Sequence, residues 1–118
     1  MLAHDAFSDV LVEQVAPGER VVAGSPTAAV TTLGEVGDGT GAGTGAEAGL
    51  WEMTPGTATD VEAEEIFVVL SGRATLTFEA DGETIELGPG VVVRLRDGER
   101  TTWTVHETIR KAYLTPRT

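Results

Sequence analysis

From Glu64 to Gly90 the chain reads EEIFVVLSGRATLTFEADGETIELGPG, in which two apolar runs are separated by an Asp-Gly pair. Apolar and polar residues alternate from Arg73 to Phe78, and this period of two is typical of a strand with one buried face. Asp81 and Gly82 tolerate the positive φ angles of a tight turn. The stretch therefore predicts a β-hairpin that ends at a second turn, GPG.

The same pattern of strands and turns continues toward the C-terminus. After the GPG turn come VVVRL, a turn at Asp97-Gly98, and the segments TTWTVH and TIRKAYL, the last of which ends at Leu114. These segments are rich in the β-branched and aromatic residues that strands favour. Short strands separated by turns at this spacing are typical of a β-sandwich or barrel. We therefore predict an all-β fold.

The chain has 118 residues, which is enough for one hydrophobic core and too few for two. We expect a single domain over residues 20–118, preceded by an N-terminal tail or edge segment at 1–19. Between 34 and 49 nearly every residue is Gly, Thr, Ala or acidic, so this stretch is predicted to be a flexible surface loop. The glycines at 41, 43 and 45 resemble a phosphate-binding loop only superficially, because neither a lysine nor a helical pattern follows them.

The composition argues against several classes of function. The chain carries 19 acidic and 8 basic residues, a formal charge of −11, which repels nucleic-acid backbones and anionic lipid surfaces. It has no cysteine, so it can form neither a disulfide nor a cysteine-based zinc site. The N-terminus lacks the apolar run of a signal peptide, and no stretch of about 18 apolar residues occurs. We expect a cytoplasmic protein without nucleic-acid or membrane partners.

Three stretches resemble a known family: GLWEMTPG from Gly49, EEIFVVLSG within the hairpin stretch, and TWTVHETIRKAY, which ends at Tyr113. They resemble the short cupins grouped with the C-terminal domain of ureidoglycine aminohydrolase and with ethanolamine-utilisation cupins. The matching residues are Trp51, Glu52, Thr54, Pro55, Gly56, Glu65, Leu70, Gly72, Trp103, Val105, Glu107, Arg110, Lys111 and Tyr113. The resemblance covers residues 20–113 and implies a cupin (RmlC-like jelly-roll) β-barrel or sandwich. It also implies a homodimer that pairs through an edge strand.

Metal-dependent cupins hold their ion with three histidines and one glutamate, a mixture that suits transition metals. Matching their spacing to this chain places Glu65 at the glutamate position. The histidine positions fall near Ala58 and Asp60 and at Thr101, none of which is a histidine. The whole chain has two histidines, so one subunit cannot assemble a three-histidine site. We therefore expect no metal ion and no other cofactor.

Acidic residues are the first candidates for chemistry. Glu65 shares a strand face with Phe67, and an apolar environment of this kind suits a general acid or base. The alternative is a structural ion pair between Glu65 and a basic residue. With Asp60 and Glu62, Glu65 could also form an all-oxygen site, which would prefer Mg, Ca or Mn. Otherwise the alternating Asp60, Glu62 and Glu64 predict a solvated face.

Five residues are candidates for ligand contacts. Trp51 and Trp103 are the chain's two tryptophans, and each is either a core residue or a wall of the ligand pocket. Lys111 and Tyr113 are two residues apart, so they face the same way on a strand. Directed inward they would bind an anionic or polar metabolite, and directed outward they would solubilise the sheet edge. Thr101, at the third histidine position, completes the set.

The two histidines are expected to lie outside the site. His106 falls on the opposite strand face from Trp103, which predicts a position at the surface or at a subunit contact. His4 lies in the predicted N-terminal tail, and we assign it no role.

Three functions of different classes remain. The favoured one is a metal-free cupin that binds a small polar metabolite in its barrel, as a sensor, carrier or accessory domain. The second is a metal-independent hydrolase, isomerase or lyase, with Glu65 as acid or base and Lys111 or Tyr113 as electrostatic partner. The third is a structural or assembly module whose barrel is filled by side chains.

Overall fold

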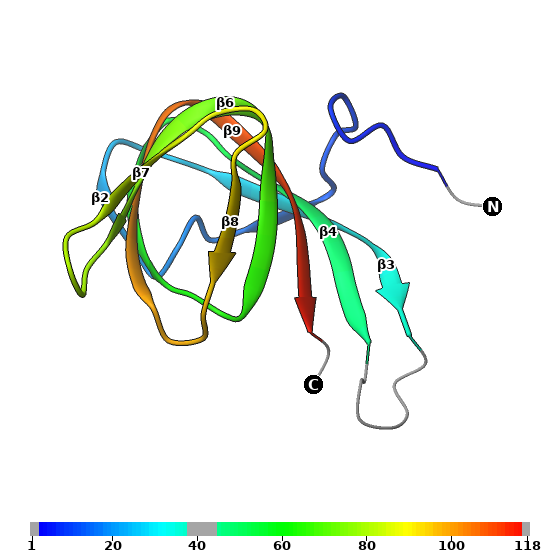
Figure 1. Cartoon of the computed structure of the whole chain (residues 1–118). Coiled ribbons are helices and arrows are strands. Elements are labelled where there is room, and N and C mark those ends of the chain that lie inside the picture. Colours follow the sequence, from blue (N-terminus) through cyan, green and yellow to red (C-terminus); the bar gives the residue numbers. More distant parts are fainter. Residues whose placement is uncertain (1–2, 38–44, 117–118) are drawn as a thin grey trace.

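The computed structural model describes residues 3–37 and 45–116, and within them it forms nine strands and no helix (Figure 1). The strands are β1 (Glu13–Val15), β2 (Arg20–Ala23), β3 (Ala28–Val36), β4 (Ala46–Met53), β5 (Gly56–Val61), β6 (Glu65–Phe78), β7 (Thr84–Leu87), β8 (Val92–Leu95) and β9 (Arg100–Pro116). All their pairings are antiparallel, so the prediction of an all-β fold is confirmed. A helix long and apolar enough to cross a membrane is not found in these residues.

Two long strands, β6 and β9, bend so that the sheet curls into a barrel (Figure 1). β6 pairs with β7, β8 and β9, while β9 pairs along its other edge with β5 and then with β4. The register between β6 and β9 shifts around Gly72, whose φ of 88° favours glycine. The sequence suggested separate short runs on the two sides of this glycine, and the bend joins them into one strand.

The alternation along each strand sorts side chains between the interior and the exterior of the barrel. On β6, Phe67 and Val69 are buried, while Ile66, on the other face of the strand, is exposed. The largest fully buried side chains are Phe67, Leu50, Met53, Leu76, Leu95, Ile109 and Val69. Most of them belong to one interior cluster, which forms the packed floor beneath the site described below.

The N-terminal segment packs on the outer face of the sheet. Leu11 is buried against Leu50 of β4 in a second apolar cluster. Arg110 on β9 donates one hydrogen bond to the carbonyl oxygen of Ala6 at 3.1 Å and another to Glu52 at 2.6 Å. β1 then pairs with β3 at the end of the sheet. Within residues 3–19, β1 is the one strand, and it lies at the end of the strand order.

The predicted loop over residues 34–49 is too wide. β3 extends to Val36 and β4 begins at Ala46, and the ladder between them pairs Gly34 with Ala48. Backbone hydrogen bonds hold this ladder, and they do not require large side chains, so a composition rich in glycine and alanine misled the prediction. Residues 38–44, with the glycines at 41 and 43, lie outside the described residues.

The predicted Asp-Gly turns are both present. In the hairpin between β6 and β7, Phe78 donates its backbone N–H to the carbonyl oxygen of Glu83 at 2.8 Å, and Gly82 has a φ of 70°. Gly98, between β8 and β9, has a φ of 85°. Both glycines therefore adopt the left-handed conformation that the sequence pattern indicated.

Candidate ligand-binding cavity

A cavity of about 320 Å³ lies at the end of the barrel where β5 stops and β6 begins. It is lined by Ala16, Pro17, Glu47, Trp51, Asp60, Glu62, Ala63, Glu65, Trp103, Lys111, Tyr113 and Thr115. These residues come from β4, β5, β6 and β9, from the segment before β2, and from the connection between β5 and β6. The volume is at the lower end of the range for small-molecule sites.

Lys111 places its ammonium nitrogen among three aromatic rings, those of Trp51 and Trp103 in the cavity wall and that of Phe67 in the core. Nζ lies 4.5 Å from the ring centroid of Phe67, 4.8 Å from that of Trp51 and 5.0 Å from that of Trp103. Glu65 supplies the counter-charge, because Lys111 Nζ donates to Glu65 Oε2 at 2.6 Å. Only 7% of the Lys111 side chain and 17% of the Glu65 side chain are exposed. The ammonium is therefore held by a desolvated ion pair and by cation–π contacts.

This arrangement corresponds to the structural alternative that was left open for Glu65. Its Oε2 is engaged by Lys111, so it cannot take up a substrate proton without loss of the ion pair. Of the two directions left open for Lys111 and Tyr113, the inward one is found, since both line the cavity.

Trp51 and Trp103 form an aromatic wall. Their ring centroids are 5.3 Å apart with the planes tilted by 58°, and Phe67 lies 5.6 Å from Trp103. Such tilted pairs are favourable arrangements of aromatic rings. Both tryptophans pack on the interior cluster and also line the cavity. Each tryptophan therefore packs against the core and also forms part of the cavity wall.

Glu62 is buried and is fixed by two side chains of β9. Its Oε2 accepts a hydrogen bond from the Thr101 hydroxyl at 2.6 Å and another from the Trp103 ring N–H at 2.9 Å. Thr101 is 2% exposed and is not among the residues that line the cavity. It therefore orients Glu62 from behind, whereas the sequence had suggested a direct ligand contact.

The prediction that Asp60, Glu62 and Glu64 share a solvated face is wrong at Glu62. The chain between β5 and β6 does not continue as a strand, because it is tied to the turn between β8 and β9. Glu62 donates its N–H to the carbonyl oxygen of Glu99 at 2.8 Å and accepts from the N–H of Gly98 at 2.8 Å. This local pairing turns the Glu62 side chain into the barrel.

Two titratable groups that line the cavity have raised pKa values. Burial raises the pKa of Asp60 above its ordinary value, and the neighbouring Glu62 carboxylate raises it further. Burial likewise raises the pKa of Tyr113, and the carboxylates of Glu47 and Glu65 add to the effect. Both groups therefore disfavour an additional negative charge.

The position of Tyr113 depends on a glycine in the neighbouring strand. Gly49 on β4 lies opposite Tyr113 in the ladder with β9. A Cβ atom on residue 49 would collide with the phenol ring and its oxygen. The glycine that opens the GLWE stretch thus lets the phenol pack across the strand.

The positions that hold histidines in metal-dependent cupins have other uses in this chain. Ala58 is fully buried in the core, and the Thr101 hydroxyl is donated to Glu62. The all-oxygen alternative from Asp60, Glu62 and Glu65 is not supported either. Within residues 3–37 and 45–116, no three His, Cys, Asp or Glu side chains are grouped so that they could hold a metal ion.

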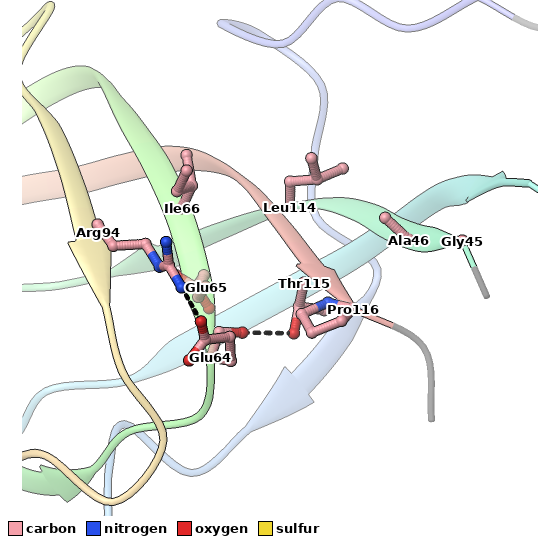
Figure 2. A pocket seen from close by; sticks show the side chains of 9 residues that line it. All are labelled: Gly45, Ala46, Glu64, Glu65, Ile66, Arg94, Leu114, Thr115 and Pro116. Carbon is pink, nitrogen blue, oxygen red and sulfur yellow. Dashed lines mark hydrogen bonds and ion pairs between the residues drawn. The ribbon is translucent and has the colours of Figure 1, made fainter. Parts of the chain in front are cut away.

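A second hollow, of about 290 Å³, lies beside the barrel end and is lined by both polar and apolar side chains (Figure 2). Figure 2 shows the Arg94 guanidinium directed at the Glu64 carboxylate, a hydrogen bond that lowers the pKa of Glu64. The Thr115 hydroxyl donates to the Glu64 carbonyl oxygen at 2.7 Å. Because these polar groups satisfy one another and the remaining lining includes Ile66 and Leu114, the barrel cavity is the better candidate site.

The sequence anticipated much of the cavity. The predicted residues that line it are Glu65, Trp51, Trp103, Lys111 and Tyr113. It gave Glu62 no role beyond the carboxylate alternative and missed Glu47. The available signal for Glu62 was the pair of inward-facing donors on β9, Thr101 and Trp103, which need an acceptor once they are buried. His106 is exposed and contacts the Thr75 hydroxyl at 3.0 Å, which agrees with the predicted surface position.

Comparison with protein families gives one match over most of the chain. A family model described as the EutQ-like cupin domain matches residues 40–113. No curated protein matches the sequence.

Solved structures share the fold. Ethanolamine utilization protein Q (EutQ) of Salmonella typhimurium is 22% identical over 76% of this chain and 69% of that chain, with a TM-score of 0.60. EutQ of Clostridium difficile is 18% identical over 78% of this chain and 69% of that chain, with a TM-score of 0.61. A Rhizobium leguminosarum protein of unknown function is 29% identical over 76% of this chain and 82% of that chain, with a TM-score of 0.62. The prediction of a cupin fold is confirmed.

Proposed function

The chain belongs to the EutQ-like cupin domain family, and from this premise we propose that it binds a small polar metabolite in its barrel cavity without a metal ion. The observation that carries the proposal is the convergence of polar and aromatic side chains from four strands on one cavity of about 320 Å³. A packed apolar core lies beneath it. Concave sites of this composition are the usual places for small ligands.

We propose a site without a metal ion because the side chains that would bind one are missing or are engaged by other groups. Histidine is missing from every position where metal-dependent cupins use it, and both histidines of the chain lie elsewhere. The carboxylates that could replace them have other partners: Glu65 is bound by Lys111, and Glu62 by Thr101 and Trp103.

A metal-independent hydrolase, isomerase or lyase is the second candidate. It is favoured by the presence of Glu65, Lys111 and Tyr113 around one cavity. It is weakened by the direct ion pair, because Glu65 and Lys111 offset each other's charge. A purely structural module is supported less, since a barrel filled by side chains would leave no cavity of this size.

Elemental analysis and a thermal-shift screen test the proposal. We expect less than one metal ion per purified chain, and a rise in Tm with at least one compound from a panel of small amines, carboxylates and alcohols. A ligand at one hundred times its Kd would stabilise the fold by about 2.7 kcal/mol. Stoichiometric metal, with no organic compound that raises Tm, would contradict the proposal.

Two further expectations from the sequence belong to this proposal. The first is a cytoplasmic location, which cell fractionation tests. The second is a homodimer formed through an edge strand. Its support is β2, a four-residue strand that pairs with β5 alone among the described strands and is exposed at every position.

A further inference from the structure

We infer that the cavity selects a cation, so that its ligand is a small organic ammonium or guanidinium compound. This inference rests on the proposed function, because it names the class of ligand for the same cavity. It differs from the sequence expectation, in which an inward-facing lysine would bind an anionic or polar metabolite.

The charges that line the cavity are unbalanced. Four carboxylates face it, from Glu47, Asp60, Glu62 and Glu65, and among the described lining residues Lys111 is the single basic side chain. The Glu65 carboxylate neutralises that positive charge through the direct ion pair. Glu47, Asp60 and Glu62 then have no basic partner within the lining.

Lys111 is not available to an anionic ligand. Its side chain is 7% exposed, its Nζ is bound to Glu65, and three aromatic rings surround it. An entering anion would instead approach carboxylates. At 4 Å, two like charges repel by about 1 kcal/mol in water and about 4 kcal/mol at the effective dielectric constant near a protein surface. The same term attracts a cation.

The raised pKa values of two lining groups include a contribution from these carboxylates. The raised pKa of Asp60 on β5 reflects burial first and Glu62 second, while Lys111 opposes the shift. The raised pKa of Tyr113 on β9 reflects burial first and then Glu47 and Glu65. At both groups the neighbouring carboxylates therefore add to the effect of burial.

The geometry also supplies an acceptor and an apolar wall. Both hydrogen bonds to Glu62 end on Oε2, so Oε1 takes part in neither of them. Trp51, which is only partly buried, lines the same cavity. A carboxylate oxygen beside an aromatic face is a suitable environment for an alkylammonium ion.

The chain contains its own reporters for a test. Both of its tryptophans line the cavity, so a ¹⁵N-labelled sample gives two indole N–H resonances, one of which belongs to the group that donates to Glu62. We would titrate the protein with butylammonium, butanol and butyrate at neutral pH and constant ionic strength. These probes share a carbon skeleton and differ in charge.

The expected result is a saturable shift of the Trp103 indole resonance with butylammonium, at a Kd about tenfold or more below those of the other two probes. Glu62→Gln keeps an acceptor oxygen and should weaken butylammonium binding about tenfold or more. Asp60→Asn, at a less buried position, provides a second test if the first variant folds poorly. Glu83→Gln, in the turn between β6 and β7, removes the same charge outside the cavity lining and should leave binding unchanged.

The outcomes separate the two proposals. Equal or tighter binding of butyrate or butanol would overturn the selection for a cation and leave the binding function standing. Equal weakening by Glu83→Gln would also overturn it, since the effect would then come from net charge alone. The absence of a saturable indole shift with all three probes would contradict the binding function and the inference together.

Discussion

At the scale of single residues, the most consequential feature is the ion pair of Lys111 and Glu65 within an aromatic enclosure. Taking two charges out of water costs several kcal/mol for each ion, and the cost is offset only when both partners stay in place. Here Nζ and Oε2 are 2.6 Å apart, and ring faces contact the ammonium. Each partner is therefore expected to be required by the other.

Removal of one partner should be strongly destabilising. We expect Lys111→Met or Glu65→Gln to lower the free energy of unfolding by about 3–5 kcal/mol, because each leaves a buried charge without its counter-ion. The double variant should lose much less than the sum of the two single losses. Urea denaturation of the four proteins measures this coupling.

An exposed ion pair provides the matched control. Arg73 and Glu107 lie 3.3 Å apart with about two thirds of each side chain exposed. Glu107→Gln should cost at most about 1 kcal/mol. Additive losses at Lys111 and Glu65, or losses no larger than the control's, would show that the pair does not hold the cavity wall.

Asp60 should show that the cavity costs stability. Its raised pKa means that the folded state binds the proton more tightly than the unfolded state does. Its contribution is therefore present at low pH and is lost as the pH rises through the folded-state pKa. Asp60→Asn should raise Tm relative to the wild type, with a gap that widens from about pH 3 to pH 7.

Asp5 offers a comparison of opposite sign. Its pKa is lowered by hydrogen bonds from the Ser8 side chain and from the backbone N–H groups of Phe7 and Ser8. Its contribution is present above the ordinary pKa of aspartate and is lost as the pH falls, so Asp5→Asn should lower Tm at neutral pH. A gap for Asp60→Asn that stays constant with pH would contradict the assigned environment.

At the scale of elements, the bend in the ladder between β6 and β9 shapes the barrel. The register between the two strands shifts on both sides of Gly72, which has a φ of 88°. A Cβ atom there would collide with the carbonyl oxygen of Thr108 and with the backbone of Ile109. The two strands could not then approach each other as closely at the bend.

Two glycine substitutions separate strain from collision. Gly72→Ala should reduce the free energy of unfolding by about 2–5 kcal/mol, since a steric clash adds to the cost of a positive φ. Gly82→Ala should cost only about 1–2 kcal/mol, because its φ is 70° but the space around it is open. Thermal or urea unfolding compares them, and equal losses would mean that the contact with β9 does not constrain the bend.

At the scale of the whole molecule, the fold could be predicted because local signals agreed with one another. Alternating apolar residues and Asp-Gly turns located β6 to β9, since strand period and turn chemistry are local properties. The part that failed depended on backbone pairing between β3 and β4. The ladder of Gly34 with Ala48 is held by backbone atoms, which the sequence does not display.

Some features of the cavity could likewise be predicted from local sequence, whereas others depend on tertiary contacts. Strand alternation predicted that Lys111 and Tyr113 face the same way, because it needs no tertiary information, but it left open whether that direction is inward or outward. The inward turn of Glu62 arises from backbone hydrogen bonds to Gly98 and Glu99, more than thirty residues away in the chain. The neutralisation of Lys111 by Glu65 likewise needs the pairing of β6 with β9.

The proposed dimer belongs to this scale as well. β2 has a free edge and exposes Val21 and Val22, so we expect size-exclusion chromatography with light scattering to give twice the chain mass of 12.3 kDa. Val22→Lys should shift the protein toward the monomer, whereas Val12→Lys, at an exposed apolar position outside β2, should not. A monomeric wild type, or a Val22→Lys dimer of unchanged stability, would contradict pairing through β2.

If a small molecule binds in the barrel cavity, a variant with a blocked cavity should lose the thermal shift that the wild type shows. Ala63 lines the cavity at an exposed position, so Ala63→Trp should fill the space with little effect on the core. We predict that small compounds which raise the Tm of the wild type leave the Tm of Ala63→Trp unchanged. Equal shifts in both proteins, or no shift in either, would contradict the claim.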